Sequence, residues 1–151
     1  MNAKMKTPFG VLGIAVTDGF LKRIEFLPGD EPLLLPSDPF TEKVCREIEA
    51  YLSDPDFRFG IPLMPEGTLF QKRVWNEIAK IPRGKTLEYG QIAKTLSSSP
   101  RAVGQACGSN PIPIVIPCHR VVSRSGPGGF MHRHEGNPLL IKKWLLSHES
   151  D

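Results

Sequence analysis

Hydrophobic positions in the first part of the chain follow a strand pattern. Residues 11–16 and 20–26 are short runs of mostly apolar residues, and the dipeptide Asp18-Gly19 between them suits a tight turn. The pattern predicts a β-hairpin.

A helix pattern follows a loop rich in proline and glycine. The tripeptide Ser37-Asp38-Pro39 is typical of a helix start, and the apolar residues after it recur at every fourth position: Phe40, Val44, Ile48 and Leu52. Alternation then returns at Phe57, Phe59 and Ile61, which predicts a further strand. Residues 1–66 therefore read as a small α/β domain without a recognisable catalytic cluster.

Residues 62–67 mark a boundary, and the remaining residues, 67–151, follow mainly helical patterns. Thr68 and Gln71 have the spacing of a capping box, and the stripe behind them is Phe70, Val74 and Ile78. A last helix is predicted from Asn137-Pro138 to Glu149. The predicted fold class is α/β (α+β), with a mostly helical second domain.

Two short helices in this second part have the outline of a helix-turn-helix. The first covers residues 89–96, and the second begins at Ser99-Pro100 and ends near Cys107. The second helix carries polar Arg101, Gln105 and Ser109 beside the small residues Ala102, Gly104, Ala106 and Gly108. Small side chains suit either the approach of a DNA groove or the close packing of two helices, and spacing alone favours neither.

Residues 111–122 contain the most reactive side chain of the sequence. Pro111, Pro113 and Pro117 fix φ and remove backbone donors, which predicts a stiff, extended segment ending in Cys118-His119-Arg120. A thiol beside cationic or proton-accepting neighbours is in a setting that favours the nucleophilic thiolate. The alternative is a cysteine that acts as a small buried hydrophobe, although packing alone does not explain the adjacent His119 and Arg120.

Composition narrows the class of protein. The chain has 151 residues, of which 40% are hydrophobic and 23% charged, with no apolar run of membrane-spanning length and no secretion signal pattern at its N-terminus. We therefore expect a soluble, cytoplasmic protein that does not bind membranes. Three widely spaced cysteines argue against a disulfide framework and a zinc site.

Charge is divided unevenly along the chain. Residues 1–67 hold 7 Lys and Arg against 11 Asp and Glu, whereas residues 68–151 hold 12 against 5. The basic part contains Cys118. Such a distribution suggests nucleic acid as a partner, although ordinary basic domains also reach this charge.

These motifs together resemble one protein family. Residues 116–122, Ile-Pro-Cys-His-Arg-Val-Val, closely resemble the active-site motif of the O6-alkylguanine-DNA alkyltransferases, also called methylated-DNA–protein-cysteine methyltransferases. The similarity covers residues 67–149 in order and with familiar spacings, through Gly67-Thr68-x-Phe70-Gln71, Ile81-Pro-x-Gly84, Tyr89-x-Gln91, Arg101-Ala-Val-Gly104, Ser109-Asn110-Pro111 and Lys143-Trp-Leu-Leu-x-His-Glu149.

The resemblance implies a fold and a function. It implies a ribonuclease-H-like N-terminal domain in residues 1–66 and a DNA-binding alkyltransferase domain with winged-helix or helix-turn-helix character in residues 67–151. The implied activity is direct DNA repair, in which an alkyl group moves irreversibly and once per molecule from O6 of guanine, with O4 of thymine as a second candidate, to Cys118. The implied partner is double-stranded DNA carrying O6-alkylguanine, bound by a monomer that uses no cofactor and no metal.

The resemblance also assigns catalytic roles. Cys118 would accept the alkyl group, His119 would remove the thiol proton through a water molecule, and Glu149 would orient the imidazole. Asn110 would brace the segment that carries Cys118, with an ordinary Asn-Pro turn as the alternative. Tyr89 would lie near the base and assist its departure, with a core tyrosine as the alternative.

Further residues would bind DNA and the alkyl group. Arg101 would fill the gap left by a nucleotide flipped out through the minor groove. The other predicted DNA contacts are Ala102, Gly104, Gln105, Ser109, Arg120 and Arg124, although an internal ion pair suits Arg120 equally well. The predicted alkyl pocket consists of Val121, Phe130 and Met131. Residues 130–136 depart from the family pattern, which leaves the range of alkyl groups open.

Three other classes of protein are weighed against this one. A non-catalytic lesion binder on the same scaffold would lack the cysteine, which is present here as Cys118. A helix-turn-helix transcription factor would need a dimerisation helix that the chain does not obviously contain. A cysteine hydrolase would need an oxyanion site, which adjacent Cys and His residues on one rigid segment fit poorly.

Overall fold

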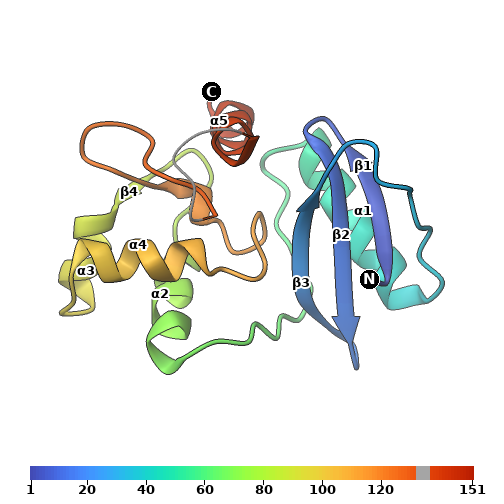
Figure 1. The fold of residues 1–151 in the computed structure, drawn as a ribbon, viewed down its shortest axis with the longest axis horizontal. Helices are drawn as coiled ribbons and strands as arrows, with labels where there is room; N and C mark the ends of the chain where they lie inside the picture. Colours follow the sequence, from blue (N-terminus) through green and yellow to red (C-terminus); the bar gives the residue numbers. More distant parts are fainter. Residues whose placement is uncertain (132–136) are drawn as a thin grey trace. The chain divides into compact units, whose positions relative to one another are not determined.

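A computed structural model describes residues 1–131 and 137–151. The chain divides into two compact units, Met1–Glu66 and Gly67–Asp151, and each is described by itself. Helices and strands occur in both units (Figure 1), so the predicted mixed α/β class is confirmed.

The first unit contains a three-stranded antiparallel sheet in the order β1-β2-β3. Its strands are β1 (Ala3–Thr7), β2 (Gly10–Thr17) and β3 (Phe20–Leu27). The predicted hairpin is confirmed as β2 and β3. Asp18 and Gly19 both have positive φ angles, 50° and 79°, as a two-residue turn between twisted strands requires. Strand β1 was not predicted from the sequence, because it has only five residues; its lysines do alternate with buried residues, as in a half-buried strand.

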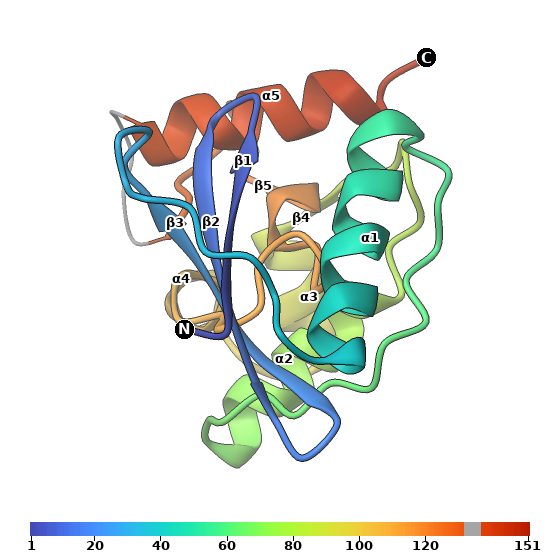
Figure 2. The same ribbon diagram turned by 90° about the vertical axis from the view of Figure 1, so that its right-hand side faces the viewer.

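Helix α1 (Pro39–Ser53) lies along one face of this sheet (Figures 1 and 2). It begins where predicted, because an Asp38 carboxylate oxygen accepts a 2.9 Å hydrogen bond from the Thr41 backbone N–H and Pro39 needs no partner for a missing N–H. The buried side of the helix is wider than the predicted stripe and comprises Thr41, Val44, Cys45, Ile48 and Tyr51.

The strand predicted around Phe57 and Phe59 is wrong. The Phe57 N–H instead closes a turn by donating to the Asp54 carbonyl over 3.0 Å. The ring of Phe59 lies 5.6 Å from the ring of Tyr51 in α1 and 5.6 Å from that of Phe57. The alternating aromatic residues therefore reflect packing against α1, not a ladder of strand hydrogen bonds.

In the second unit, α2 (Leu69–Ala79) confirms the predicted capping box. The Gln71 N–H donates to the Thr68 hydroxyl over 3.1 Å, and the Thr68 N–H donates to the Gln71 side chain over 2.8 Å. Trp75 is buried in this helix, and its indole N–H donates to the Ala106 carbonyl over 2.8 Å. This bond fixes α2 against α4.

The two predicted short helices are α3 (Tyr89–Thr95) and α4 (Pro100–Gly108), joined by residues 96–99 (Figure 1). The Ser99 hydroxyl accepts from the Ala102 N–H over 3.1 Å and caps α4, as its sequence predicts. Beside them, the short strands β4 (Leu87–Glu88) and β5 (Val121–Val122) pair in parallel. The unit ends with α5 (Asn137–Glu149).

Candidate active site

The proline-rich segment is a compact loop, and the predicted extended segment is wrong. The Asn110 side chain donates to the Ile116 carbonyl over 2.8 Å and accepts from the Ile112 N–H over 2.9 Å, and the Ile116 N–H donates to the Ile112 carbonyl. The turn forces Ile114 to φ 76°, a conformation that β-branched residues rarely adopt. Asn110 thus closes the loop that precedes Cys118.

Cys118 begins a short 3-10 helix, η1 (Cys118–Arg120). The Cys118 N–H donates to the Ile116 carbonyl over 2.8 Å, and the Arg120 N–H donates to the Pro117 carbonyl over 2.9 Å. The backbone of Cys118 is therefore fixed by the loop in front of it. Because Cys118 and His119 belong to a helical turn, their side chains do not alternate between two faces as they would in an extended chain.

A buried charged network lies next to Cys118. The His119 Nε2 atom is 2.8 Å from a carboxylate oxygen of Glu149, and both side chains are almost fully inaccessible. Arg120 donates to the same carboxylate through Nε and Nη2, both over 2.8 Å, and through Nη1 to the Ile81 carbonyl over 2.6 Å. The network joins η1 to the last residue of α5.

The network sets the proton positions on His119. Because the Glu149 carboxylate accepts two charged donors from Arg120, it is ionised, and His119 Nε2 carries the proton that it donates. Burial lowers the pKa of His119 below its usual value despite the hydrogen bond to Glu149, so the imidazole is neutral. Its Nδ1 is the buried side-chain nitrogen or oxygen that has no hydrogen-bond partner within residues 1–131 and 137–151. It is therefore available to accept a proton.

Cys118 lies at a cavity of about 480 Å³. This volume is in the usual range for small-molecule sites. The cavity brings together residues from α3, α4, η1 and the loop after β5: Tyr89, Pro100, Arg101, Gly104, Gln105, Cys107, Gly108, Cys118, Ser123, Gly128, Gly129, Phe130 and Met131. Among them are seven site residues predicted from the sequence: Tyr89, Arg101, Gly104, Gln105, Cys118, Phe130 and Met131.

The sulfur of Cys118 is a protonated thiol in the resting protein. Burial raises its pKa to about 11, and the hydrogen bond from Asn110 and the charge of Lys142 offset this effect only in part. The expectation of a resting thiolate, based on cationic neighbours, is wrong because desolvation outweighs them. Ionisation of Cys118 therefore requires a proton acceptor, and the unpartnered Nδ1 of the adjacent His119 is a chemical candidate.

Tyr89 lies at the cavity with a neutral phenol. Burial, followed by the neighbouring thiols Cys107 and Cys118, raises its pKa to about 12. Its hydroxyl donates a long, 3.4 Å hydrogen bond to the Gly129 carbonyl. Gly128 has φ 76°, and a Cβ atom added there would lie 2.9 Å from the Tyr89 hydroxyl. Glycine at this position therefore makes room for the phenol.

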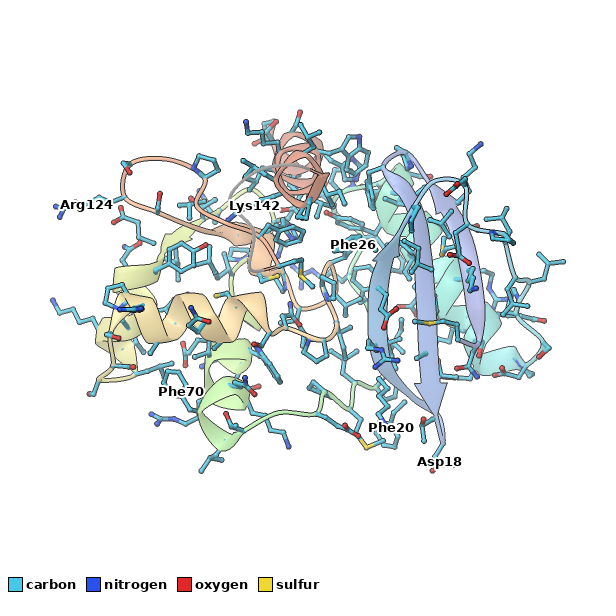
Figure 3. The ribbon with its side chains drawn as sticks, viewed as in Figure 1. Asp18, Phe20, Phe26, Phe70, Arg124 and Lys142 are labelled. Atoms are coloured by element: carbon cyan, nitrogen blue, oxygen red, sulfur yellow. The ribbon has the colours of Figure 1, made fainter. Side chains whose placement is uncertain are left out.

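Other predicted residues lie away from the cavity lining. Asn110, His119 and Glu149 are buried and support Cys118 from within the unit. Ala102 and Ser109 belong to or flank α4, and Arg124 is exposed and points outward from its loop (Figure 3).

Two predicted assignments change with the structure. The contacts of Arg120 favour its alternative, the internal ion pair, because its guanidinium binds Glu149 and Ile81. The Val121 side chain is buried and is not among the cavity-lining residues. The predicted change in substrate range concerned residues 130–136, of which 132–136 lie outside the described residues.

Lys142 was not predicted from the sequence. This α5 residue has no exposed surface, and its ammonium donates to the carbonyls of Val121 and Gly129 over 2.7 and 2.8 Å (Figure 3). The sequence contained one signal for the burial of Lys142. It follows Ile141 in a helix whose apolar residues are spread around the whole circumference, so a lysine there can be buried. Cys107, which also lines the cavity, carried no separate signal.

Neither a metal cluster nor a membrane helix is found in the described part of the chain. Residues 1–131 and 137–151 contain no group of three or more His, Cys, Asp or Glu side chains placed to hold a metal ion. Within the same residues, every helix is too short or too polar to cross a membrane.

Known proteins are similar to this chain in both sequence and fold. Residues 69–151 match the model of the 6-O-methylguanine DNA methyltransferase, DNA binding domain. A methylated-DNA–protein-cysteine methyltransferase of Methanosarcina acetivorans is 38% identical, over 97% of this chain and 96% of its own. One from Sulfolobus acidocaldarius is 34% identical, over 95% of this chain and 88% of its own.

Solved structures give the same result. A single-residue variant of the Mycobacterium tuberculosis O6-methylguanine methyltransferase superimposes with a TM-score of 0.83 at 31% identity, covering 98% of this chain and 91% of its own. The Mycobacterium tuberculosis OGT in complex with DNA has a TM-score of 0.78 at 34% identity, covering 97% and 90%. The sequence and the fold agree, and the chain belongs to the 6-O-methylguanine DNA methyltransferase family, the methylated-DNA–protein-cysteine methyltransferases.

Proposed function

We propose that this protein repairs DNA by transferring the alkyl group of O6-alkylguanine to the sulfur of Cys118. The observation that carries the proposal is the position of Cys118, which lines a base-sized cavity and directly precedes a neutral histidine oriented by a buried carboxylate. This arrangement supplies a nucleophile, a base and an orienting group.

The reaction begins with proton transfer from Cys118 to His119 Nδ1 through a water molecule. The imidazolium that forms is stabilised by Glu149, which already accepts from Nε2. The thiolate then attacks the alkyl carbon, a sulfur–carbon bond forms, and the carbon–oxygen bond breaks with its electron pair moving to guanine O6. The proton removed from the thiol ends on the departing guanine, so charge and atoms balance.

Tyr89 would assist the departure of the base. Its raised pKa keeps the phenol protonated, so it donates a hydrogen bond to the purine as negative charge develops there. The weak 3.4 Å bond to Gly129 leaves this donor readily redirected toward a bound base. Tyr89 therefore acts on the leaving group, and His119 acts on the nucleophile.

The product is a thioether on Cys118, which explains single use. A sulfur–carbon bond to an alkyl group has no easy hydrolysis route. The base available in this site to activate a water molecule is the neutral imidazole of His119, which is too weak to reverse the reaction. Each molecule would thus repair one lesion. Phe130 and Met131 at the cavity would contact the alkyl group, and O4-alkylthymine remains a second candidate substrate.

DNA would approach the exposed side of α4. Arg101 and Gln105 are exposed there, and Gly104 and Gly108 of the same helix carry no side chain that would hold a backbone away. Because O6 is part of a paired, stacked base and Cys118 lies inside a cavity, the nucleotide must flip into that cavity at a cost of a few kcal/mol, which Arg101 would help to offset by filling the gap. A relative of known structure, the Mycobacterium tuberculosis OGT, has been solved in complex with DNA, which supports this role for the fold.

Intact-mass spectrometry tests the proposal. The protein is mixed with duplex DNA containing one O6-methylguanine, and each chain is expected to gain a single methyl group on the peptide that contains Cys118. Cys118→Ala should gain none, whereas Cys107→Ala should still be methylated. Methylation at another residue, or the repair of many lesions by one molecule, would refute the proposal.

A further inference from the structure

We propose that Lys142 is a positioning residue for alkyl transfer, which holds the backbone around the cavity and places a positive charge near the sulfur when Cys118 loses its proton. The inference rests on the proposed function for the reaction that it serves. It assigns a task to a buried lysine that neither the acid–base network nor the DNA-binding surface uses.

The contacts of Lys142 join two parts of the site. Its ammonium donates to the Val121 carbonyl, directly after η1, and to the Gly129 carbonyl in the cavity loop. The same Gly129 carbonyl accepts from the Tyr89 hydroxyl, and the ammonium lies 5.8 Å from the centre of the Tyr89 ring. One side chain of α5 therefore connects the nucleophile segment, the cavity loop and the tyrosine.

The burial of this charge is costly, which argues against a purely packing role. The Lys142 side chain has no exposed surface, and within residues 1–131 and 137–151 no carboxylate forms an ion pair with it. Lysine is almost never fully buried without such a partner, and an apolar side chain would fill the same space without the desolvation cost. We therefore infer that the positive charge of Lys142, which no carboxylate of the described residues neutralises in the resting protein, has a function.

Cys118 supplies the matching negative charge during the reaction. The charge of Lys142 lowers the pKa of the Cys118 thiol, and in return Cys118 and Cys107 act to raise the pKa of Lys142. Lys142 also disfavours the charged form of His119, but it acts there after Glu149 and Arg120. The ammonium thus favours the thiolate form of Cys118 itself.

The effect of Lys142 must depend on pH. Burial lowers its pKa to about 8, so the amine is charged at neutral pH and loses its proton in mildly alkaline solution. The other titratable groups around it, Cys107, Cys118 and Tyr89, keep their protons in that range because their pKa values are raised. A change near pH 8 is therefore attributable to Lys142.

The test compares Lys142→Met with Lys143→Met, since Lys143 is the exposed neighbour in the same helix. The first measurement is the rate at which iodoacetamide modifies Cys118 in the free protein, read by peptide mass spectrometry. At pH 7, Lys142→Met is expected to react about tenfold more slowly than the wild type, equivalent to one pKa unit. The two rates should converge above about pH 9, and Lys143→Met should match the wild type throughout.

The second measurement is the single-turnover rate of alkyl transfer from free O6-benzylguanine. Because Lys142 also positions Gly129 and Tyr89, transfer is expected to fall more than iodoacetamide reactivity does, by a further tenfold or so. Lys142→Arg should recover thiol reactivity at pH 7 better than Lys142→Gln, since only Arg restores the charge. If Lys142→Met does not fold, the comparison of the Arg and Gln variants still tests the electrostatic role of Lys142.

Equal reactivity of Cys118 in the wild type and in Lys142→Met at pH 7 would overturn the electrostatic role. A deficit that is the same at pH 7 and pH 9.5, or equal rates for the Arg and Gln variants, would also overturn it. The iodoacetamide assay contains neither DNA nor alkylguanine, so its result stands apart from the proposed function. If the wild type transferred no alkyl group while the pH-dependent difference persisted, the proposed function alone would fail.

Discussion

Replacement of Glu149 by Gln isolates the role of the buried carboxylate. Glu149 accepts two hydrogen bonds from Arg120 and one from His119. The amide of Gln has one acceptor oxygen, and the Arg120 guanidinium attracts it more strongly than the neutral imidazole does. The amide NH₂ must then face His119 Nε2, which becomes an acceptor, so the ring proton moves to Nδ1.

The expected loss follows from this tautomer change. With Nδ1 protonated, His119 no longer accepts the Cys118 proton, and general base catalysis contributes about 10²–10⁴-fold to a rate. Loss of the carboxylate charge also leaves the largely buried Arg120 without a counterion. Because breaking a buried ion pair from one side costs about 3–5 kcal/mol, and Gln keeps one acceptor, we expect a destabilisation of about 2–4 kcal/mol.

Single-turnover transfer from an O6-methylguanine duplex, measured by rapid quench, gives the rate, and urea unfolding gives the stability. Asp151→Asn is the matched control, because the Asp151 carboxylate is exposed where it pairs with Arg83, and neither quantity should change. Transfer by a folded Glu149→Gln variant at more than a tenth of the wild-type rate would refute the assignment of His119 as the base.

Three further predictions concern other residues. Arg101→Ala should slow repair of duplex DNA far more than transfer from free O6-benzylguanine, and equal slowing of both would contradict the proposed role of Arg101 in base flipping. Gly128→Ala, which requires an unfavourable φ and a 2.9 Å contact with Tyr89, should cost about 1–3 kcal/mol and slow transfer, whereas Gly126→Ala, with open space, should do neither. Unfolding free energy should fall between about pH 9 and 11, because unfolded thiols ionise from pH 9 whereas Cys45 and Cys118 keep their protons to about pH 11, with burial as the main cause. Cys45→Ala should flatten this fall by about 2–3 kcal/mol, and an unchanged slope would contradict the raised pKa of Cys45.

Local signals predicted the elements that depend on local interactions. The Asp18-Gly19 hairpin and the Thr68 capping box were predicted correctly because turns and helix caps are determined by residues within about four positions of one another. The supposed strand at Phe57 and Phe59 failed because an alternating pattern reports burial, and the contact with Tyr51 that produces it lies outside the segment.

The site was predicted unevenly for a similar reason. The motif around Cys118 identified the reactive residues, and the structure brings several of them to one cavity. Sequence alone did not show that burial would raise the pKa of Cys118, because desolvation depends on every element packed around the sulfur. Lys142 was missed because its partners are main-chain carbonyls, which any sequence supplies.

The high pKa of the Cys118 thiol has a consequence for the lifetime of the protein. Peroxides and small electrophiles in the cell attack thiolates, and a sulfur that stays protonated and shielded to about pH 11 offers them little. In the proposed reaction each molecule is used once, so reaction with such compounds would consume the protein before it met damaged DNA. A thiol that stays protonated in the free protein would thus preserve each molecule for damaged DNA.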